Sequence, residues 1–108
     1  MTDAFKEMYE VILNRRENPQ EGSYTCYLFE KGLDKILKKC GEECTEMVIA
    51  AKNKDNEELA NEINDLLYHT AVLMVERGVT VEEIEEIMRE RSKKIGNLKQ
   101  FHVSDHNT

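Results

Sequence analysis

Two pairs of acidic residues constrain this chain more than any other feature of its sequence. Glu43 pairs with Glu46 and Glu62 pairs with Asp65, each at a spacing of three residues. Residues three apart lie on the same face of an α-helix. The short polar segment 53–56 separates the pairs, and helices joined by a short loop normally pack side by side and antiparallel. The sequence therefore predicts that these carboxylates meet where two helices touch.

Such a cluster calls for a compensating cation, because like charges repel and burial removes hydration. The predicted ligands are all oxygen atoms, which suit a hard ion such as Mg²⁺, with Mn²⁺ as a possible substitute. The Glu-x-x-His repeat of di-iron bundles is absent from the sequence. These residues predict a metal-dependent enzyme acting on a phosphorylated substrate. The alternative is that the acids are solvated, as most isolated Glu-x-x-Glu pairs are.

The composition favours an all-α fold. With 108 residues, one Pro and five Gly, the chain suits one helical domain, which we place at residues 1–100, followed by a polar, flexible tail at 101–108. Apolar residues recur at helical spacing in four to five segments, which together predict an antiparallel bundle. The first three expected helices span roughly Asp3 to Glu17, Cys26 to Lys31 and Leu33 to Ala51. The fourth follows a cap at Asp55 and carries an apolar stripe from Leu59 to Met74, and the fifth follows a predicted capping box of Thr80 and Glu83 and runs to about Ile95.

Charge and hydropathy exclude several classes of protein. A net charge of −7 argues against binding nucleic acid or an anionic membrane. No apolar run approaches the length of a membrane span, and the first residues do not resemble a secretory signal. Three cysteines at irregular spacing do not form a disulfide framework. We therefore expect a cytoplasmic protein.

Several polar residues are candidates for phosphate binding, each with a structural alternative. Arg15 and Arg16 end the first predicted helix, where cations also complement the helix dipole. Ser23 and Thr25 precede the next helix, where a hydroxyl either caps the helix or contacts phosphate. Arg91 occupies a position where the period expects a core residue, so it either snorkels or reaches a ligand or partner chain.

Three residues close to the acids have weaker signals. His69 lies four residues after Asp65 and either orients a ligand or is a satisfied boundary histidine. Cys40 and Cys44 fall in an apolar stripe without other thiols or imidazoles nearby, so we expect them to fill the core. No Gly-rich phosphate loop occurs, so phosphate binding must depend on the metal, Lys and Arg. From the residues alone, the prediction is a Mg²⁺-dependent phosphoanhydride hydrolase.

The acid motif resembles that of the all-α nucleoside triphosphate pyrophosphatase (MazG-like) superfamily. Within that superfamily, five short motifs are similar to those of the phosphoribosyl-ATP pyrophosphatase family of histidine biosynthesis. They are Ser23-Tyr-Thr25, Glu30-Lys-Gly32, Lys38-Lys39-Cys-Gly-Glu-Glu43, Ile49-Ala-Ala-Lys52 and Asp65-Leu-Leu-Tyr-His69. The similarity covers about Leu13 to Arg91, most of the chain.

This resemblance implies an enzyme that hydrolyses phosphoribosyl-ATP to phosphoribosyl-AMP and pyrophosphate, the second step of the pathway. It also implies a homodimer that completes the bundle, and a separate protein for the cyclohydrolase of the next step. The implied Mg²⁺ ligands, which also form the catalytic centre, are Glu43, Glu46, Glu62 and Asp65. The candidates for substrate contacts are Lys39, Arg15, Arg16, Ser23, Tyr24, Thr25, His69 and Arg91.

Two other functions compete with this one. The first is a house-cleaning pyrophosphatase acting on non-standard nucleoside triphosphates, which would share the same acids. The second, from a different class, is a non-catalytic helical interaction module whose acids serve only solubility.

Overall fold

The computed structural model describes residues 3–95, which form five α-helices and no strand. The helices are α1 (Asp3–Glu17), α2 (Tyr24–Lys31), α3 (Leu33–Lys52), α4 (Asn56–Arg77) and α5 (Val81–Ile95). The predicted all-α fold is therefore confirmed. The expected tail at 101–108, like the last residues of the expected domain, lies outside the described residues.

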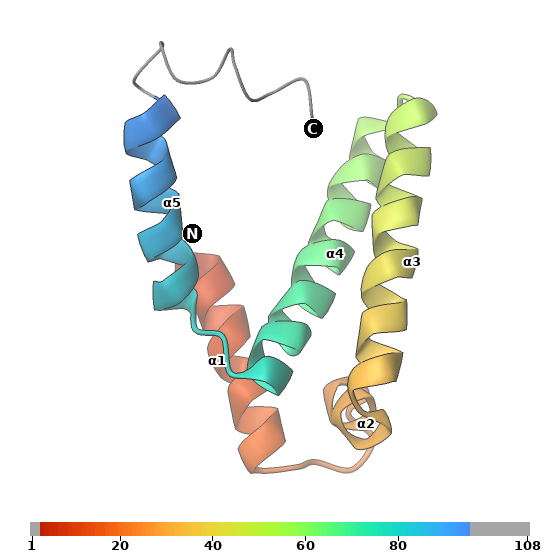
Figure 1. The fold of residues 1–108 in the computed structure, drawn as a ribbon. Coiled ribbons are helices and arrows are strands. Elements are labelled where there is room, and N and C mark those ends of the chain that lie inside the picture. The colour runs from red at the N-terminus through yellow and green to blue at the C-terminus, as the bar shows by residue number, and fades with distance from the viewer. Residues whose placement is uncertain (1–2, 96–108) are drawn as a thin grey trace.

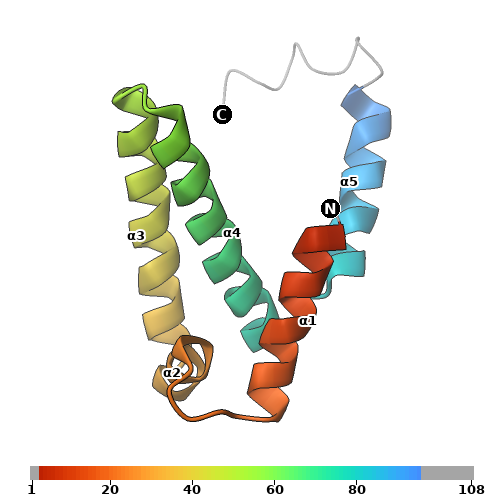
Figure 2. The ribbon, with the colours of Figure 1, turned by 180° about the vertical axis from the view of Figure 1, so that it is seen from behind.

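The helices form two arms joined at a common base (Figures 1 and 2). One arm is the antiparallel hairpin of α3 and α4, and the other consists of α1 and α5. The short helix α2 lies at the base, beside the start of α3. Contacts of α1 and α2 with α4 hold the arms together. The Tyr9 hydroxyl adds a hydrogen bond of 2.9 Å to the carbonyl of Val79, in the loop after α4.

Local signals in the sequence set the helix ends. Ser23 caps α2, since its hydroxyl accepts a hydrogen bond from the Cys26 N–H at 3.1 Å. Asp55 caps α4 in the same way, accepting from the Glu58 N–H at 3.1 Å. Gly78 ends α4 in the left-handed region with φ of 79°, a conformation that favours glycine.

The boundary before α5 is the clearest of these signals. The Glu83 N–H donates to the Thr80 hydroxyl at 3.1 Å, and the Thr80 N–H donates to Glu83 Oε1 at 2.8 Å. Together these bonds make the predicted capping box. Val79 and Ile84, which bracket this box, both pack against the core.

The core lies at the base, where α1, α2, α3 and α4 converge. Its most completely buried side chains are Ile12, Leu28, Ile36, Val72 and Val81. Burying apolar surface of this kind is the main favourable contribution to folding. The base of the molecule therefore carries most of the stability.

The apolar stripes of α3 and α4 are only partly buried within one chain. Leu37 and Val48 on α3 are 46% and 53% exposed, and Ile63 and Leu67 on α4 are 37% and 36% exposed. These residues stay exposed because α5 points away from the hairpin (Figure 1). Cys44, expected in the core, is likewise exposed on this stripe.

None of the helices in residues 3–95 combines the length and the apolar character that crossing a membrane requires.

We predict that Ile12→Ala destabilises the protein by about 2–5 kcal/mol, because the substitution leaves a cavity in a packed core. Its neighbour Val11 is 53% exposed on the same helix, so Val11→Ala is the matched control, expected within about 0.5 kcal/mol of the parent. Urea denaturation followed by circular dichroism measures both. Equal losses in the two variants would contradict the placement of the core.

Candidate metal and substrate site

Three of the four predicted carboxylates meet between α3 and α4. Glu43 comes from α3, and Glu62 and Asp65 come from α4. One oxygen of each carboxylate lies within 4.8 Å of the others. Glu43 is only 6% exposed, Glu62 is half-buried and Asp65 is exposed. The structure thus brings these acids together at the edge of the helix–helix contact, as the sequence predicted.

Two oxygen atoms of this cluster are left without partners. Oε1 of Glu43 and Oε1 of Glu62 are buried and accept no hydrogen bond from the described residues. A buried carboxylate oxygen without a donor is costly, and a cation bound between the two helices could remove this cost. An all-carboxylate donor set fits a hard divalent ion, for which Mg²⁺ and Mn²⁺ are the usual choices.

Glu46 lies outside this group of three but acts on it electrostatically. Burial raises the pKa of Glu62, and the negative charges of Glu46, Asp65, Glu43 and Glu58 raise that pKa further. Glu46 is itself exposed on α3. It is not among the acids whose oxygens meet within 4.8 Å, so its role as a metal ligand stays a prediction.

Lys39 provides a cation beside the acids. Its Nζ lies 3.4 Å from Glu42 Oε1 and 3.5 Å from Glu43 Oε2. Burial opposes the charge on Lys39, but its neighbours Tyr24, Glu42 and Glu43 outweigh this effect and raise its pKa. Lys39 therefore stays positively charged next to the place where a substrate phosphate would meet the carboxylates.

His69 connects α4, the helix that carries Glu62 and Asp65, to the start of α2. It is 6% exposed, and its Nδ1 lies 2.8 Å from the Asp65 backbone carbonyl. A carbonyl only accepts, so Nδ1 carries the proton and the other ring nitrogen, Nε2, accepts from the Tyr24 hydroxyl at 3.1 Å. With both nitrogens engaged by protein groups, the geometry of His69 favours the alternative of a satisfied histidine over that of a residue that orients a ligand.

The hydroxyls before and within α2 are engaged with protein. Ser23 acts as the helix cap, and the Thr25 hydroxyl is hydrogen-bonded to the Tyr68 hydroxyl on α4. Tyr24 also stacks on Tyr68, at a centroid distance of 6.2 Å. These contacts fix the start of α2 against the helix that carries Glu62 and Asp65.

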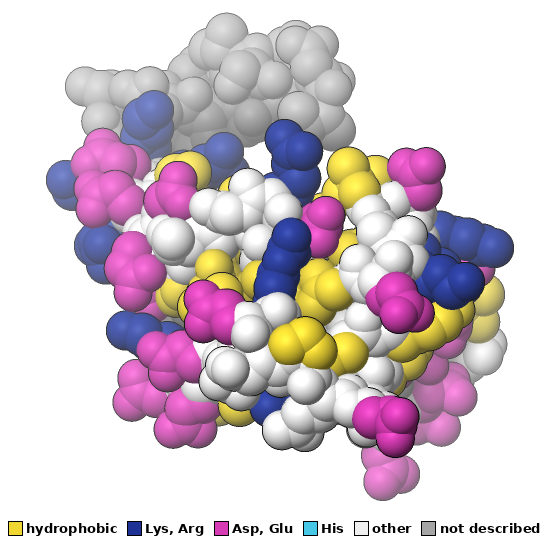
Figure 3. All heavy atoms as spheres, turned by 90° about the horizontal axis from the view of Figure 1, so that it is seen from below, with side chains coloured by type: hydrophobic (Ala, Val, Ile, Leu, Met, Phe, Trp, Pro, Cys, Tyr) yellow, Lys and Arg dark blue, Asp and Glu magenta, His cyan; other side chains and the backbone are white. Residues whose placement is uncertain are grey.

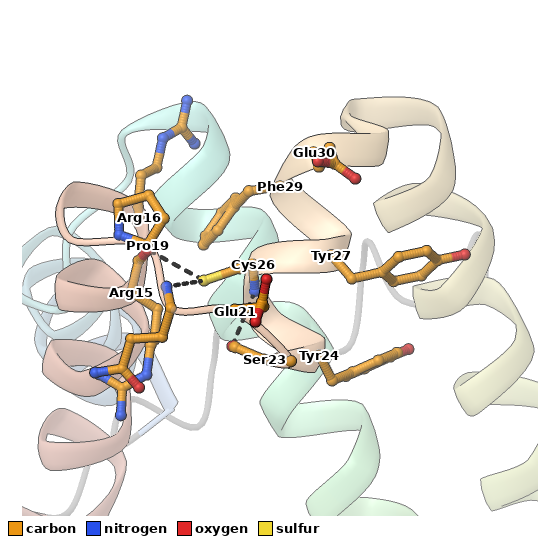
Figure 4. Close-up of a pocket in the computed structure, with 12 residues that line it drawn as sticks. Arg15, Arg16, Pro19, Glu21, Ser23, Tyr24, Cys26, Tyr27, Phe29 and Glu30 are labelled. Carbon is orange, nitrogen blue, oxygen red and sulfur yellow. Dashed lines mark hydrogen bonds between the residues drawn. The ribbon is translucent and has the colours of Figure 1, made fainter.

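The two arginines of α1 have different surroundings. Arg16 forms an ion pair with Glu76 at 2.7 Å and lies over the Phe29 ring, which favours the structural interpretation. Arg15 forms no ion pair with the described residues. Both arginines, with Cys26, line a cavity of about 850 Å³ between the end of α1, the following loop and α2 (Figure 4). None of the predicted metal ligands lines this cavity, so the structure does not bring the two arginines into the acidic cluster.

Arg91 is not brought to the site within one chain. It is exposed on α5, in the arm opposite the α3–α4 hairpin (Figure 2). Of the cysteines near the acids, Cys40 partly fills the interior as predicted, with its thiol 3.5 Å from the His69 carbonyl. Burial raises the pKa of the Cys40 thiol, which suits a packing role.

Sequence reasoning did not single out Tyr27 or Lys35. Nζ of Lys35 lies 5.9 Å from the centroid of the Tyr27 ring, and Tyr27 stacks on Tyr24 at 6.0 Å. A signal did exist, since Tyr27 follows Tyr24 by three residues and Lys35 precedes Lys39 by four, as expected of neighbours on one helix face. The contact between them depends on how α2 turns into α3, which helical periodicity does not report.

The fold and the site define a class of protein. They describe a small all-α domain in which carboxylates from two antiparallel helices form a cluster that could hold a metal ion, next to a lysine. Enzymes of this kind use a divalent cation to act on phosphorylated substrates.

Comparison with known proteins gives the family. The profile of phosphoribosyl-ATP pyrophosphohydrolase matches residues 5–92. The phosphoribosyl-ATP pyrophosphatase of Clostridium novyi is 55% identical over 90% of this chain and 88% of its own length. The enzymes of the same name from Streptococcus thermophilus and Bacillus cytotoxicus are 58% and 52% identical, over 84% and 93% of this chain and 88% and 94% of their own lengths. The chain belongs to the phosphoribosyl-ATP pyrophosphohydrolase family.

We predict that Glu62→Gln stabilises the metal-free protein at neutral pH. Because the pKa of Glu62 is raised in the folded state, folding favours its protonated form. Stability contributed by this residue is therefore present below its unfolded pKa, about 4.3, and is lost as the pH rises through the higher folded value. The glutamine variant does not titrate and avoids this loss.

Thermal melting in a chelator, from about pH 4 to about pH 8, measures this difference, and Glu10→Gln on α1 is the control. Adding Mg²⁺ should then stabilise the parent more than the Glu62→Gln variant, because the variant lacks a ligand. A variant less stable than the parent in chelator at neutral pH would disprove the repulsion argument.

Proposed function

We propose that Glu43, Glu46, Glu62 and Asp65 hold the Mg²⁺ with which this chain hydrolyses phosphoribosyl-ATP. The chain is an enzyme of histidine biosynthesis with the activity of its family, phosphoribosyl-ATP pyrophosphatase. The products are phosphoribosyl-AMP and pyrophosphate. Because substrate and product are highly charged metabolites that do not cross membranes unaided, we place the enzyme in the cytoplasm with the rest of its pathway.

One observation carries the metal assignment. Glu43 and Glu62 each point a buried, unpartnered oxygen into a cluster made only of carboxylates. In a purely structural cluster these oxygens would be paired with donors or exposed to water. Their arrangement instead suits a cation shared with a substrate, because Mg²⁺ sites of this kind use few carboxylates and leave positions for phosphate oxygens.

Different residues of the chain carry out different parts of the hydrolysis. When bound, Mg²⁺ neutralises the phosphate oxygens and stabilises pyrophosphate as it leaves. One carboxylate of the cluster accepts a proton from water as the water oxygen bonds to a phosphorus of the α–β anhydride. The bond from the attacked phosphorus to the bridging oxygen breaks, and its electron pair stays on that oxygen, which departs with the other phosphate group. Lys39, next to Glu43, donates hydrogen bonds to the negative phosphate oxygens.

We further propose that the chain works as a homodimer. The exposed apolar residues of the hairpin lie along α3 and α4, including Leu37, Val48, Ile63 and Leu67. A two-helix hairpin with one uncovered apolar face completes a four-helix bundle when two copies pair. Hydrophobic side chains are also visible across the end of the molecule where α2 lies (Figure 3).

The first test is pyrophosphate release from phosphoribosyl-ATP, with Mg²⁺ and with a chelator. We expect metal-dependent release that exceeds release from ATP by orders of magnitude. A panel of other nucleoside triphosphates separates this activity from that of a house-cleaning pyrophosphatase. Absence of both turnover and saturable Mg²⁺ binding would support the interaction module instead.

We predict that Glu46→Gln and Asp65→Asn each lower turnover by at least about 100-fold, because both weaken metal ligation. Both side chains are exposed, so the helical content should stay unchanged. Steady-state kinetics and circular dichroism measure the two effects, with Glu57→Gln on α4 as a control. Full activity in both variants would remove these residues from the site.

We predict that Val48→Glu converts the dimer to a monomer with an intact fold. The residue is 53% exposed in the single chain, so a charge there is tolerated until a second copy covers it. Light scattering gives the mass, and Val11→Glu on α1, equally exposed, serves as the control. A parent protein that is monomeric at working concentration would overturn the proposed pairing.

A further inference from the structure

A row of aromatic side chains runs beside the acidic cluster. Tyr27, Tyr24 and Tyr68 stack in that order, with centroid distances of 6.0 Å and 6.2 Å and interplanar angles of 25° and 27°. Tyr24 is 46% exposed and Tyr27 is 39% exposed. Both rings project from α2 toward α3 and α4 (Figure 4). A half-exposed stack of aromatic rings is a suitable surface for the face of a nucleobase.

A row of polar residues accompanies these rings along α3. Lys35, Lys39 and Glu43 follow one another at intervals of four residues, so they lie on one face of the helix. Lys35 contacts the ring of Tyr27, and Lys39 contacts the carboxylate of Glu43. The rise of an α-helix places the backbone of Lys35 about 12 Å from that of Glu43.

The Tyr27 end of the row is positively charged. Lys31 and Lys35 place their Nζ atoms 5.8 Å and 5.9 Å from the centroid of this ring. Among the described residues, neither lysine forms an ion pair, whereas Lys39 pairs with two glutamates. The chain as a whole has a net charge of −7, so an unneutralised pair of lysines is a local feature. Such a pair suits a phosphate group.

We propose that Tyr27, supported from behind by Tyr24, stacks on the adenine of the substrate and that Lys31 and Lys35 bind the phosphate of its phosphoribosyl group. This inference rests on the proposed function. Phosphoribosyl-ATP carries a phosphorylated sugar on each side of the base, one with a triphosphate and one with a single phosphate. With the base on the tyrosines, the triphosphate reaches Lys39 and the carboxylates while the single phosphate reaches Lys31 and Lys35.

This arrangement explains how the enzyme distinguishes its substrate from ATP. ATP has the same base and the same triphosphate, but it lacks the second phosphorylated sugar. The acidic cluster and the tyrosines therefore treat both molecules alike, and only Lys31 and Lys35 respond to the difference. These two lysines are specificity-determining residues, separate in position from the residues that hold the metal.

The experiment compares Lys31→Ala/Lys35→Ala with the parent on two substrates. We expect the KM for phosphoribosyl-ATP to rise about 10- to 100-fold, the loss typical of charged hydrogen bonds to phosphate. The kcat should change little, and the KM for ATP should stay the same. Lys93→Ala/Lys94→Ala, in the last turn of α5, has the same change in net charge and controls for long-range attraction of the substrate.

Substitution of Tyr27 should change the two KM values in a different pattern. Tyr27→Leu removes the stacking surface, so we expect the KM to rise for phosphoribosyl-ATP and for ATP alike. Tyr27→Phe keeps the ring and should restore both values, which separates stacking from a general disturbance of α2.

The remaining outcomes decide between this inference and the function on which it rests. If the parent releases no pyrophosphate from phosphoribosyl-ATP, the proposed function itself fails. If the parent is active but the double lysine variant keeps the parental ratio of the two KM values, the lysine assignment is wrong. A selective effect of Arg15→Ala in place of the lysines would move the single phosphate to the cavity between α1 and α2 and overturn the proposal.

Discussion

Repulsion among carboxylates at the α3–α4 contact is the constraint on which the rest of this structure depends. Glu43 and Glu62 place unpartnered oxygens inside the molecule, at a free-energy cost that the hairpin must withstand. The apolar residues that offset this cost lie at the base, where Ile36 on α3 and Val72 on α4 are fully buried. Apolar burial at one end of the hairpin thus supplies most of its stability. This stability allows the acidic site to keep its unfavourable repulsion between carboxylates.

The exposed face of the hairpin and the metal site are physically connected. Within one chain the cluster borders water, because Asp65 is exposed, and the apolar stripe through Val48 and Leu67 of the same two helices is uncovered as well. In the proposed dimer a second copy covers this stripe and lowers the local dielectric constant around the acids. Lower dielectric strengthens their attraction for a divalent cation and for the phosphates it holds. The proposed pairing would therefore support both stability and chemistry.

The sequence was sufficient for the parts of the fold and site that depend on spacing along one helix. Periodicity predicted the helices, and the spacing of the acids predicted that Glu43, Glu62 and Asp65 converge. Periodicity also placed Leu37 on the apolar face of its helix, but it does not report whether another element covers that face. The Tyr27–Lys35 contact was missed because it joins α2 to α3 across Gly32. The φ of 94° at Gly32 sets the direction of one helix relative to the other, and periodicity along a single helix does not predict it.

The junction at Gly32 shows why substrate specificity and metal binding can share so small a domain. This residue adopts a φ of 94°, which residues with a Cβ rarely adopt. It sets the direction of α2 relative to α3. The hydrogen bond from Tyr24 to His69 then holds α2 against α4 as well. Through Gly32 and His69, the proposed base-binding rings are therefore fixed to both helices of the acidic cluster. A rigid spacing between base and metal favours a substrate whose reacting anhydride lies at that distance, because positioning is itself a source of rate acceleration.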